Sequence, residues 1–281
     1  MATVPRGDIV ASLNFFGRVS SDPDAKPYNN VDPSPGQPVS NYSIEPLDVT
    51  IHDIRPHFSD FSLDHDAFEI LSDVTSSTEA DFSDDDSIRQ HYYPHVEQVL
   101  RQAVPGITKI HFFDHTVRHG QPDSHRRPVD RVHIDQTAAS AEKRVRRYFS
   151  GDEADALLAH RYRIINVWRS LNNGPVESSP LCFASTSSLH DDDVIPVEHR
   201  YSNGYTGETA AIKFNPHQKW YYLSGTLPTE RILLECFDSE SLKPASHIGG
   251  RTPHTAFTHP NTSPDAEPRQ SIEVRALVFS S

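Results

Sequence analysis

Runs of hydrophobic and alternating residues predict a chain built mainly from β-strands, with a few helices before its C-terminal half. In that half, short apolar runs are separated by segments rich in Gly, Pro, Asn, Asp and Ser, which is typical of strands joined by turns. Alternation earlier in the chain predicts further extended segments, because successive side chains of a strand point to opposite faces. The predicted strands are residues 47–55, 109–117, 128–137, 164–171, 180–184, 208–214, 219–224, 231–238 and 271–279.

Helical spacing is confined to the middle of the chain. Val96, Val99, Leu100 and Ala103 recur at intervals of three and four residues and predict a helix that begins near Pro94. Two shorter helices are predicted to follow the third of the strands. Strands with irregular connections and a few helices favour a mainly β fold with flanking helices, the double-stranded β-helix or jelly-roll barrel.

The N-terminal segment differs in composition from the rest. The first forty residues contain many prolines, asparagines and aspartates, so we expect a loop-rich N-terminal extension at about 1–40. Neither an internal repeat nor a convincing linker divides the remainder. We therefore expect residues 1–281 to form a single jelly-roll domain, a length sufficient for one large core.

Charge and cysteine content narrow the class of protein. The formal charge of −13 argues against a nucleic-acid partner, which needs a basic face. No apolar run approaches the roughly 20 residues that span a bilayer, so we expect no membrane segment. The two cysteines are too few for a disulfide framework and indicate a reducing compartment. We expect a cytoplasmic protein that acts on a small molecule.

The seventeen histidines direct attention to metal binding. His133 and Asp135 are separated by one residue in a predicted strand, so both side chains point to one face and can reach one ion. A further histidine from a distant C-terminal strand would complete a two-histidine, one-carboxylate triad with open positions for co-substrate and oxygen. We assign that place to His254. His247 is a weaker rival, and the second His-x-Asp pair at His190 lies in a polar loop.

A cation near the last predicted strand suggests the co-substrate. The far carboxylate of 2-oxoglutarate needs a positive partner, and arginine binds carboxylates through two parallel hydrogen bonds. Arg269, Ser271 and Arg275 would share one strand face, so an arginine and the serine could hold that carboxylate. Which arginine does so is left open, as is the alternative that the arginine pairs with Glu267 or Glu273 on the surface.

Six short blocks, in order from about residue 40 to the C-terminus, resemble the fungal hydroxylase/desaturase family of secondary metabolism. That family includes gibberellin desaturase and is similar to a subunit of the cephamycin methoxylation system. The blocks are Tyr92-Tyr93-Pro94, Phe113-Asp114-His115-Thr116-Val117-Arg118, Val132-His133-Ile134-Asp135, Ile165-Asn166-Val167-Trp168-Arg169, Trp220-Tyr221-Tyr222 and His254-Thr255-Ala256-Phe257. The resemblance implies a jelly-roll enzyme that uses Fe(II), 2-oxoglutarate and O2 to hydroxylate or desaturate a natural-product intermediate.

The resemblance also implies roles for individual residues. Carried over by position, the metal ligands are His133, Asp135 and His254, the co-substrate is anchored by Arg269 or Arg275, and Asn166 and Arg169 line the cofactor pocket. The sequence departs from the family pattern after Pro180-Leu181, where Cys182-Phe183-Ala184-Ser185 follows. This departure leaves the ligands intact and the substrate unassigned.

Candidates for the substrate pocket come from the same blocks. They are His115 and Arg118 after a hydrophobic strand, Tyr221 and Tyr222, of which at most one faces the site, and Phe257. Two other functions remain open: a metal-dependent cupin-like oxygenase or hydrolase that does not use 2-oxoglutarate, and a non-catalytic ligand-binding or partner subunit with the same barrel. A homodimer or an accessory subunit is also open.

Overall fold

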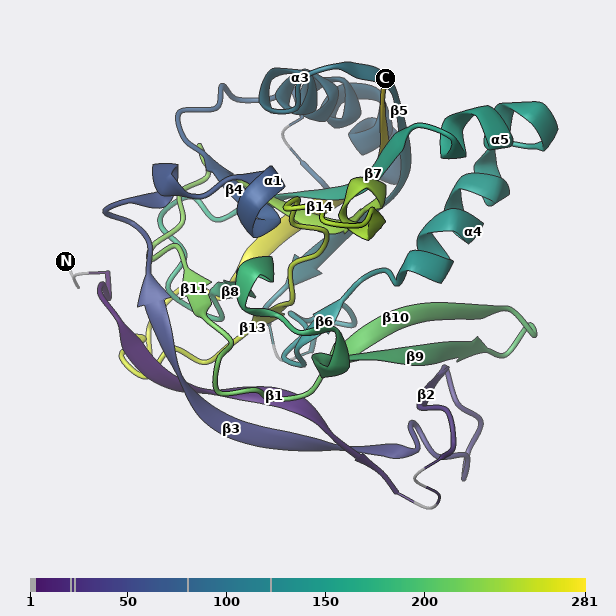
Figure 1. Ribbon diagram of the computed structural model, residues 1–281. Coiled ribbons are helices and arrows are strands. Elements are labelled where there is room, and N and C mark those ends of the chain that lie inside the picture. The colour runs from purple at the N-terminus through teal and green to yellow at the C-terminus, as the bar shows by residue number, and fades with distance from the viewer. Residues whose placement is uncertain (1–3, 21, 23, 80, 122) are drawn as a thin grey trace.

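Two β-sheets face each other in the computed structural model, which describes residues 4–20, 22, 24–79, 81–121 and 123–281 (Figure 1). The larger sheet runs in the order β1-β3-β11-β8-β13-β6-β10-β9-β2, and the smaller in the order β4-β12-β7-β14-β5. Hydrogen-bonded neighbours are therefore often distant in sequence, which brings central and C-terminal segments side by side. This two-sheet arrangement confirms the predicted mainly β fold class.

The strand boundaries are as follows. The larger sheet contains β1 (Ile9–Val19), β2 (Tyr28–Val31), β3 (Tyr42–Asp53), β6 (His133–Ile134), β8 (Leu181–Ala184), β9 (Val194–Tyr201), β10 (Thr206–Ile212), β11 (Trp220–Tyr222) and β13 (His254–Ala256). The smaller contains β4 (Phe68–Leu71), β5 (Ile107–His119), β7 (Arg161–Ser170), β12 (Arg231–Asp238) and β14 (Gln270–Ser280).

Helices flank the sheets. They are α1 (Leu63–Asp66), α2 (Asp85–Ser87), α3 (Tyr93–Ala103), α4 (Ala138–Tyr148) and α5 (Gly151–Leu158). Short 3-10 turns occur at Phe58–Asp60, Thr186–Ser188, Asp191–Asp193 and Ser239–Leu242, and a π-helical turn at Ile88–Tyr92 leads into α3. The helix predicted from residue 94 is thereby confirmed.

Helix α3 covers the outer face of the smaller sheet (Figure 1). Its buried residues Val96 and Val99 belong to one apolar cluster with Val167 of β7 and Val274 of β14. Burial of this apolar surface stabilises the contact between helix and sheet. Because side chains alternate along a strand, the neighbours of those valines point to the inner face of the sheet, where polar groups gather.

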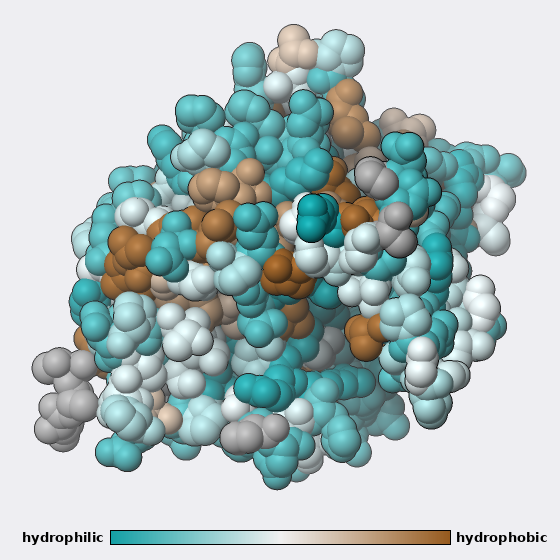
Figure 2. All heavy atoms as spheres, turned by 90° about the horizontal axis from the view of Figure 1, so that it is seen from below, coloured by the Kyte–Doolittle hydropathy of each residue, from teal (hydrophilic) through white to brown (hydrophobic). Residues whose placement is uncertain are grey.

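The N-terminal segment is a strand, and the expectation of a loop-rich extension at 1–40 was wrong for it. Strand β1 pairs antiparallel with β3 along most of its length. Its alternate residues Ala11, Leu13 and Phe15 are buried in the main core, the pattern of a strand with one covered face. The turn-forming residues that suggested a loop lie mostly after β1. Figure 2 shows the underside of the molecule, where β1 and β3 lie in Figure 1, as a mainly hydrophilic surface.

Most predicted strands are confirmed, and the largest difference occurs at 128–137. Only His133–Ile134 is a strand there, although the alternation is present: Val132 and Ile134 are fully buried and His133 and Asp135 point the other way. Its ladders are short: β10 pairs with it at two positions, and β13 at one, His254 opposite His133. Strand β9 was missed because Pro196 and charged neighbours interrupt its apolar pattern.

Candidate metal centre

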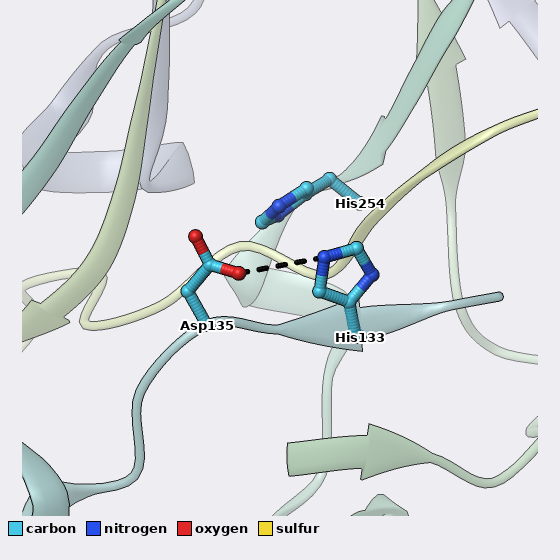
Figure 3. A group of neighbouring side chains, drawn as sticks. All are labelled: His133, Asp135 and His254. Carbon is cyan, nitrogen blue, oxygen red and sulfur yellow. Dashed lines mark ion pairs between the residues drawn. The ribbon is translucent and has the colours of Figure 1, made fainter. Parts of the chain in front are cut away.

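Three side chains from two adjacent strands of the larger sheet converge on one point (Figure 3). His133 lies in β6 with Asp135 just beyond its end, and His254 begins β13. Their ligand atoms, one from each side chain, all lie within 4.8 Å of one another. Among the described residues, this is the group of histidines and carboxylates that could hold a metal ion. Two imidazoles and one carboxylate form the facial set that leaves coordination positions open.

Both imidazoles are oriented by backbone carbonyl groups. The Nδ1 atom of His133 lies 2.7 Å from the carbonyl oxygen of Arg131, and Nδ1 of His254 lies 3.2 Å from that of Thr252. Because a carbonyl oxygen can only accept, each Nδ1 carries the hydrogen and each Nε2 presents a lone pair. The Nε2 atom of His133 is 3.4 Å from Oδ1 of Asp135. Burial, together with neighbouring His133, lowers the pKa of His254 and favours its neutral, metal-binding form.

Asp135 is held by the smaller sheet across the barrel. Asn166 of β7 and Arg275 of β14 are directly paired, and both reach the same carboxylate oxygen. The Nδ2 atom of Asn166 donates to Oδ2 of Asp135 at 2.8 Å, and Nε of Arg275 donates to it at 2.9 Å. The other oxygen, Oδ1, therefore faces the histidines. Burial alone would raise the pKa of Asp135, but Arg275 and the two histidines hold it well below its usual range.

Each side-chain nitrogen of Arg275 donates to a side chain of the protein. Besides Asp135, it donates to Asp114 at 3.1 Å, to Thr116 at 3.0 Å and to Glu273 at 2.6 Å. Burial would lower its pKa, but the surrounding carboxylates raise it. Arg275 is therefore a fixed cation that positions a candidate metal ligand, with little capacity left for another anion.

Arg269, unlike Arg275, has few hydrogen-bond partners within the protein. Its side chain is almost completely buried, Nη1 donates to the carbonyl oxygen of Ser179 at 2.7 Å, and Nε has no partner. The guanidinium lies 5.8 Å from the ring centroid of Trp168. Burial, with a contribution from Arg118, lowers the pKa of Arg269 to about 9. Since it forms no ion pair with any described residue, this buried cation is suited to binding an anion.

A small cavity links Arg269 to the metal-binding cluster. It measures about 30 Å³, and its walls include Arg269, Ser271, His133 and His254. A larger cavity of about 400 Å³ lies on the other side of His133. The two cavities share Arg118, Val129, His133 and Arg275 as lining residues, so they adjoin at the cluster. The arrangement offers one compartment beside the buried cation and a roomier one for a second molecule.

Comparison with known proteins identifies the family. A family model described as an oxidoreductase/YMDC permease-like domain matches residues 13–279. The hydroxylase/desaturase poxK of Penicillium oxalicum is 34% identical over 98% of this chain and 92% of its own length. The Fe(II)/2-oxoglutarate-dependent dioxygenase nvfI of Aspergillus novofumigatus is 32% identical over 90% of each chain. A solved structure of the iron and alpha-ketoglutarate-dependent endoperoxidase NvfI superposes with a TM-score of 0.85 at 27% identity, and the match covers 99% of this chain and 100% of the other.

The chain belongs to the fungal iron(II)/2-oxoglutarate-dependent hydroxylase/desaturase family. It is accordingly an iron(II)/2-oxoglutarate-dependent dioxygenase of secondary metabolism that uses Fe(II), 2-oxoglutarate and O2, and it has the jelly-roll fold. This assignment displaces the cupin-like, hydrolase and non-catalytic alternatives. In the described part of the chain, no helix combines the length and apolar character needed to cross a membrane.

Two residues that were predicted to lie at the site, Arg169 and His115, lie on the outer face of the smaller sheet. Arg169 is three residues after Asn166, and it contacts Ser77 and the rings of Phe82 and Tyr92 on the outer face of the smaller sheet. His115 is likewise three residues before Arg118. Residues three apart in a strand point to opposite faces, so each pair could supply only one inward side chain.

His115 is engaged on that outer face, where it lies 2.9 Å from the Tyr93 hydroxyl and 3.1 Å from the Asp85 carboxylate. Arg118, in contrast, lines both cavities at the cluster. Of the two candidates near the end of β5, only Arg118 is therefore brought to the site.

The three aromatic candidates for the substrate pocket pack elsewhere. Tyr222 donates from its hydroxyl to the carbonyl oxygen of Gly7, and its ring packs edge-on against Phe257. Tyr221 packs against Phe61 and Phe68. None of the three candidates is among the residues that line either cavity at the cluster. Strand β8 separates β11 from β13, which places the two tyrosines too far along the sheet.

The sequence analysis missed several residues around the cavities. Thr116, Trp168 and Glu273 line the small cavity, and they form one cross-strand row because Glu273 pairs with both of the others. The large cavity also contains Arg131, Arg144, Arg147 and His199. The spacing of Arg144 and Arg147 on one helical face was a usable signal, but the partner surface across the cavity comes from β9 and β10 and could not be inferred locally.

Proposed function

We propose that His133, Asp135 and His254 hold the iron(II) of this dioxygenase, that Arg269 with Ser271 binds the far carboxylate of 2-oxoglutarate, and that the 400 Å³ cavity receives the organic substrate. The observation that carries the proposal is the convergence of the three ligand atoms beside a buried arginine that has no anionic partner among the described residues. The metal and the co-substrate would then meet where the two cavities adjoin.

The donor set suits the metal chemically. Neutral imidazole nitrogens and a carboxylate oxygen bind iron(II), and the hydrogen bonds to Nδ1 and to Oδ2 hold each ligand with its free atom inward. Asn166 and Arg275 are positioning residues on this view. They leave one oxygen of Asp135 for the metal and hold the carboxylate ionised.

Arg269 is favoured over Arg275 as the anchor of 2-oxoglutarate because their pairing differs. Arg275 already balances the carboxylates of Asp135, Glu273 and Asp114, and Arg269 balances none of the described carboxylates. Its unpaired Nε and the nearby Ser271 could donate to a carboxylate in the small cavity. The anion would also relieve the cost of burying the Arg269 cation.

When bound together, iron(II), 2-oxoglutarate and oxygen supply the oxidising power to remove hydrogen from an unactivated carbon. The walls of the larger cavity orient the target carbon–hydrogen bond and exclude bulk water. Whether the product is an alcohol or an alkene depends on how closely the substrate is held, and the name hydroxylase/desaturase, which several relatives carry, supports either outcome.

We further propose a single oxygenase domain for residues 1–281, supported by the family match over 13–279, and a cytoplasmic location, supported by the two buried, free cysteines. A homodimer or an accessory subunit stays a prediction.

The test is spectroscopic. Iron(II) and 2-oxoglutarate are added without oxygen to the purified wild-type protein and to His133→Ala, and the visible charge-transfer band of the complex is recorded. We expect the band in the wild type and its loss in the variant, with both proteins shown to be folded by thermal melting. A folded, iron-replete wild type without the band would contradict the proposed function.

A further inference from the structure

The larger cavity has two chemically different ends. At its inner end it adjoins the proposed iron site through the side chains it shares with the small cavity. At its outer end it continues into a groove of about 470 Å³ between α4 and β10. The residues that line both this groove and the cavity are Arg144, Arg147, Tyr205, Gly207 and Glu208. A molecule in the cavity would therefore extend from the iron site toward α4.

The acidic residues of the cavity wall are neutralised by the protein. Asp114 pairs with Arg275 at 3.1 Å, and Asp135 is held by the same arginine. Glu208 lies 3.1 Å from the amino group of Lys26 and also accepts from the Thr137 hydroxyl. These carboxylates are thus unavailable to balance the remaining arginines.

Besides Arg118, which lies beside the cluster, three arginines on the wall have no carboxylate partner among the described residues. Arg144 lies over the ring of Phe113 at 4.7 Å, Arg147 lies over the ring of Tyr205 at 5.4 Å, and Arg131 makes a long contact of 3.4 Å with the side chain of Asn29. Within the described residues, none of the three has a carboxylate within 4.0 Å. An unpaired cationic wall is unexpected in a chain with a formal charge of −13.

Arg146, which lies between Arg144 and Arg147 in the sequence, is in contrast paired with carboxylates. Arg146 of α4 points away from the cavity and donates to Glu142 at 3.0 Å and to Asp155 at 2.8 Å. Carboxylates therefore lie near α4, but they pair with the arginine on the helix face that points away from the cavity. The side that presents Arg144 and Arg147 is left with positive charge, which would concentrate an anionic ligand at the mouth of the cavity.

The inner part of the cavity has a different character. Val129, Val197 and Ala211, which is paired with His133, contribute apolar surface on the iron side. An apolar body fits there, and a planar carboxylate fits the guanidinium groups, which bind such groups through parallel hydrogen bonds.

We propose that the substrate of this enzyme carries a carboxylate, which Arg144 and Arg147 bind at the outer end of the cavity, and that oxidation takes place on the apolar part of the molecule, remote from that group. The proposal rests on the proposed function because it takes His133, Asp135 and His254 as the iron site. On this proposal, Arg144 and Arg147 of α4 make the enzyme bind acids more tightly than neutral molecules of the same shape.

The experiment uses two fluorescent probes of one shape, 1-pyrenebutyrate and the neutral 1-pyrenebutanol. Each is titrated without oxygen into the enzyme loaded with iron(II) and 2-oxoglutarate, and binding is followed by fluorescence anisotropy. We expect the butyrate to bind about tenfold more tightly than the alcohol in the wild type, and this preference to shrink as salt rises. The double variant Arg144→Gln/Arg147→Gln should remove the preference.

Arg146→Gln is the matched control, because it removes one positive charge from the same helix on the face away from the cavity. It should retain the preference for the butyrate. Equal binding of the two probes by the wild type, binding of neither, or an equal loss in Arg146→Gln and in the double variant would overturn the proposal.

The charge-transfer band of the same samples separates the two claims. If the band forms and no preference for the acid is seen, the substrate proposal fails and the proposed iron site stands. If the band does not form in folded protein, the proposed function fails, and the substrate proposal fails with it.

Discussion

Two buried regions flank the candidate metal centre, and they differ in whether their charged groups are paired within the protein. Around Asp135, each charged group has a protein partner: Arg275 and Asn166 hold the carboxylate, and Arg275 is itself surrounded by acids. Around Arg269, a buried guanidinium has an unpaired Nε and no carboxylate partner among the described residues. A satisfied buried ion indicates a positioning role, whereas an unsatisfied one indicates a place for a ligand.

The difference in pairing distinguishes the two arginines better than their distance from the cluster does. Both arginines lie near the cluster and both line the small cavity. Only their hydrogen bonds distinguish Arg275, which holds the candidate ligand Asp135, from Arg269, whose Nε has no partner among the described residues. The predictions below test that separation, beginning with the largest expected effect.

Asp135→Ala should abolish iron(II) binding and turnover. Loss of an outer partner of a metal ligand costs about 10- to 100-fold in affinity, so loss of the ligand itself should cost more than about 100-fold. Iron affinity is measured by anaerobic titration calorimetry. Asp192→Ala, in the His190-x-Asp192 pair of the polar loop, is the control and should bind iron normally; an equal loss there would contradict the assignment.

Arg269→Gln and Arg275→Gln should have different effects. We expect Arg269→Gln to weaken 2-oxoglutarate binding by about 100-fold, because it removes the buried charge partner of the anion, with iron affinity unchanged. Arg275→Gln should instead weaken iron binding by about 10- to 100-fold.

Both affinities are measured for each of the two arginine variants, and thermal melting shows that the proteins remain folded. The opposite pattern, in which Arg275→Gln alone weakens the co-substrate, would reverse the roles of the two arginines.

Asn166→Ala should weaken iron(II) binding by about tenfold, since it removes one of the two donors that orient Asp135. Arg169→Ala is the matched control from the same strand, because its side chain lies on the outer face. It should leave iron and 2-oxoglutarate affinity unchanged. If Arg169→Ala weakened 2-oxoglutarate binding as strongly as Arg269→Gln, its placement away from the cofactor would be wrong.

Gly120→Ala should weaken 2-oxoglutarate binding by about threefold, less than the loss that a full displacement of about 1 Å can cause. A Cβ atom at Gly120 would lie 2.9 Å from the backbone nitrogen of Arg269 and 3.1 Å from its carbonyl oxygen, so the backbone that carries Arg269 must shift. Gly174→Ala, with nothing within 4 Å of the added atom, is the control. Unchanged affinity in Gly120→Ala would show that the segment adjusts freely.

Local sequence was a good guide where one periodicity governed a segment. The helix at Tyr93–Ala103 and the strand at Arg231–Asp238 were predicted because their apolar positions follow a single pattern. The spacing of His133 and Asp135 likewise predicted two inward side chains. Prediction was weakest where the pattern was mixed, as in β1, whose buried alternation was outweighed by the turn-forming residues that follow it.

Arg169 and His115 lie away from the cavities for one physical reason. Blocks of adjacent residues were carried to the site as units, although a strand delivers only alternate side chains to one face. Thus Asn166 and Arg118 reach the interior, and Arg169 and His115 face outward.

By itself, the sequence determined the mainly β fold, the helix over the smaller sheet, and the candidate ligands His133, Asp135 and His254, because each follows from local periodicity and spacing or from resemblance to a family. Only the tertiary structure distinguished Arg269 from Arg275 and left Arg144 and Arg147 unpaired beside a cavity. Pairing across sheets joins residues more than a hundred positions apart, and whether a buried charge is satisfied depends on those distant partners.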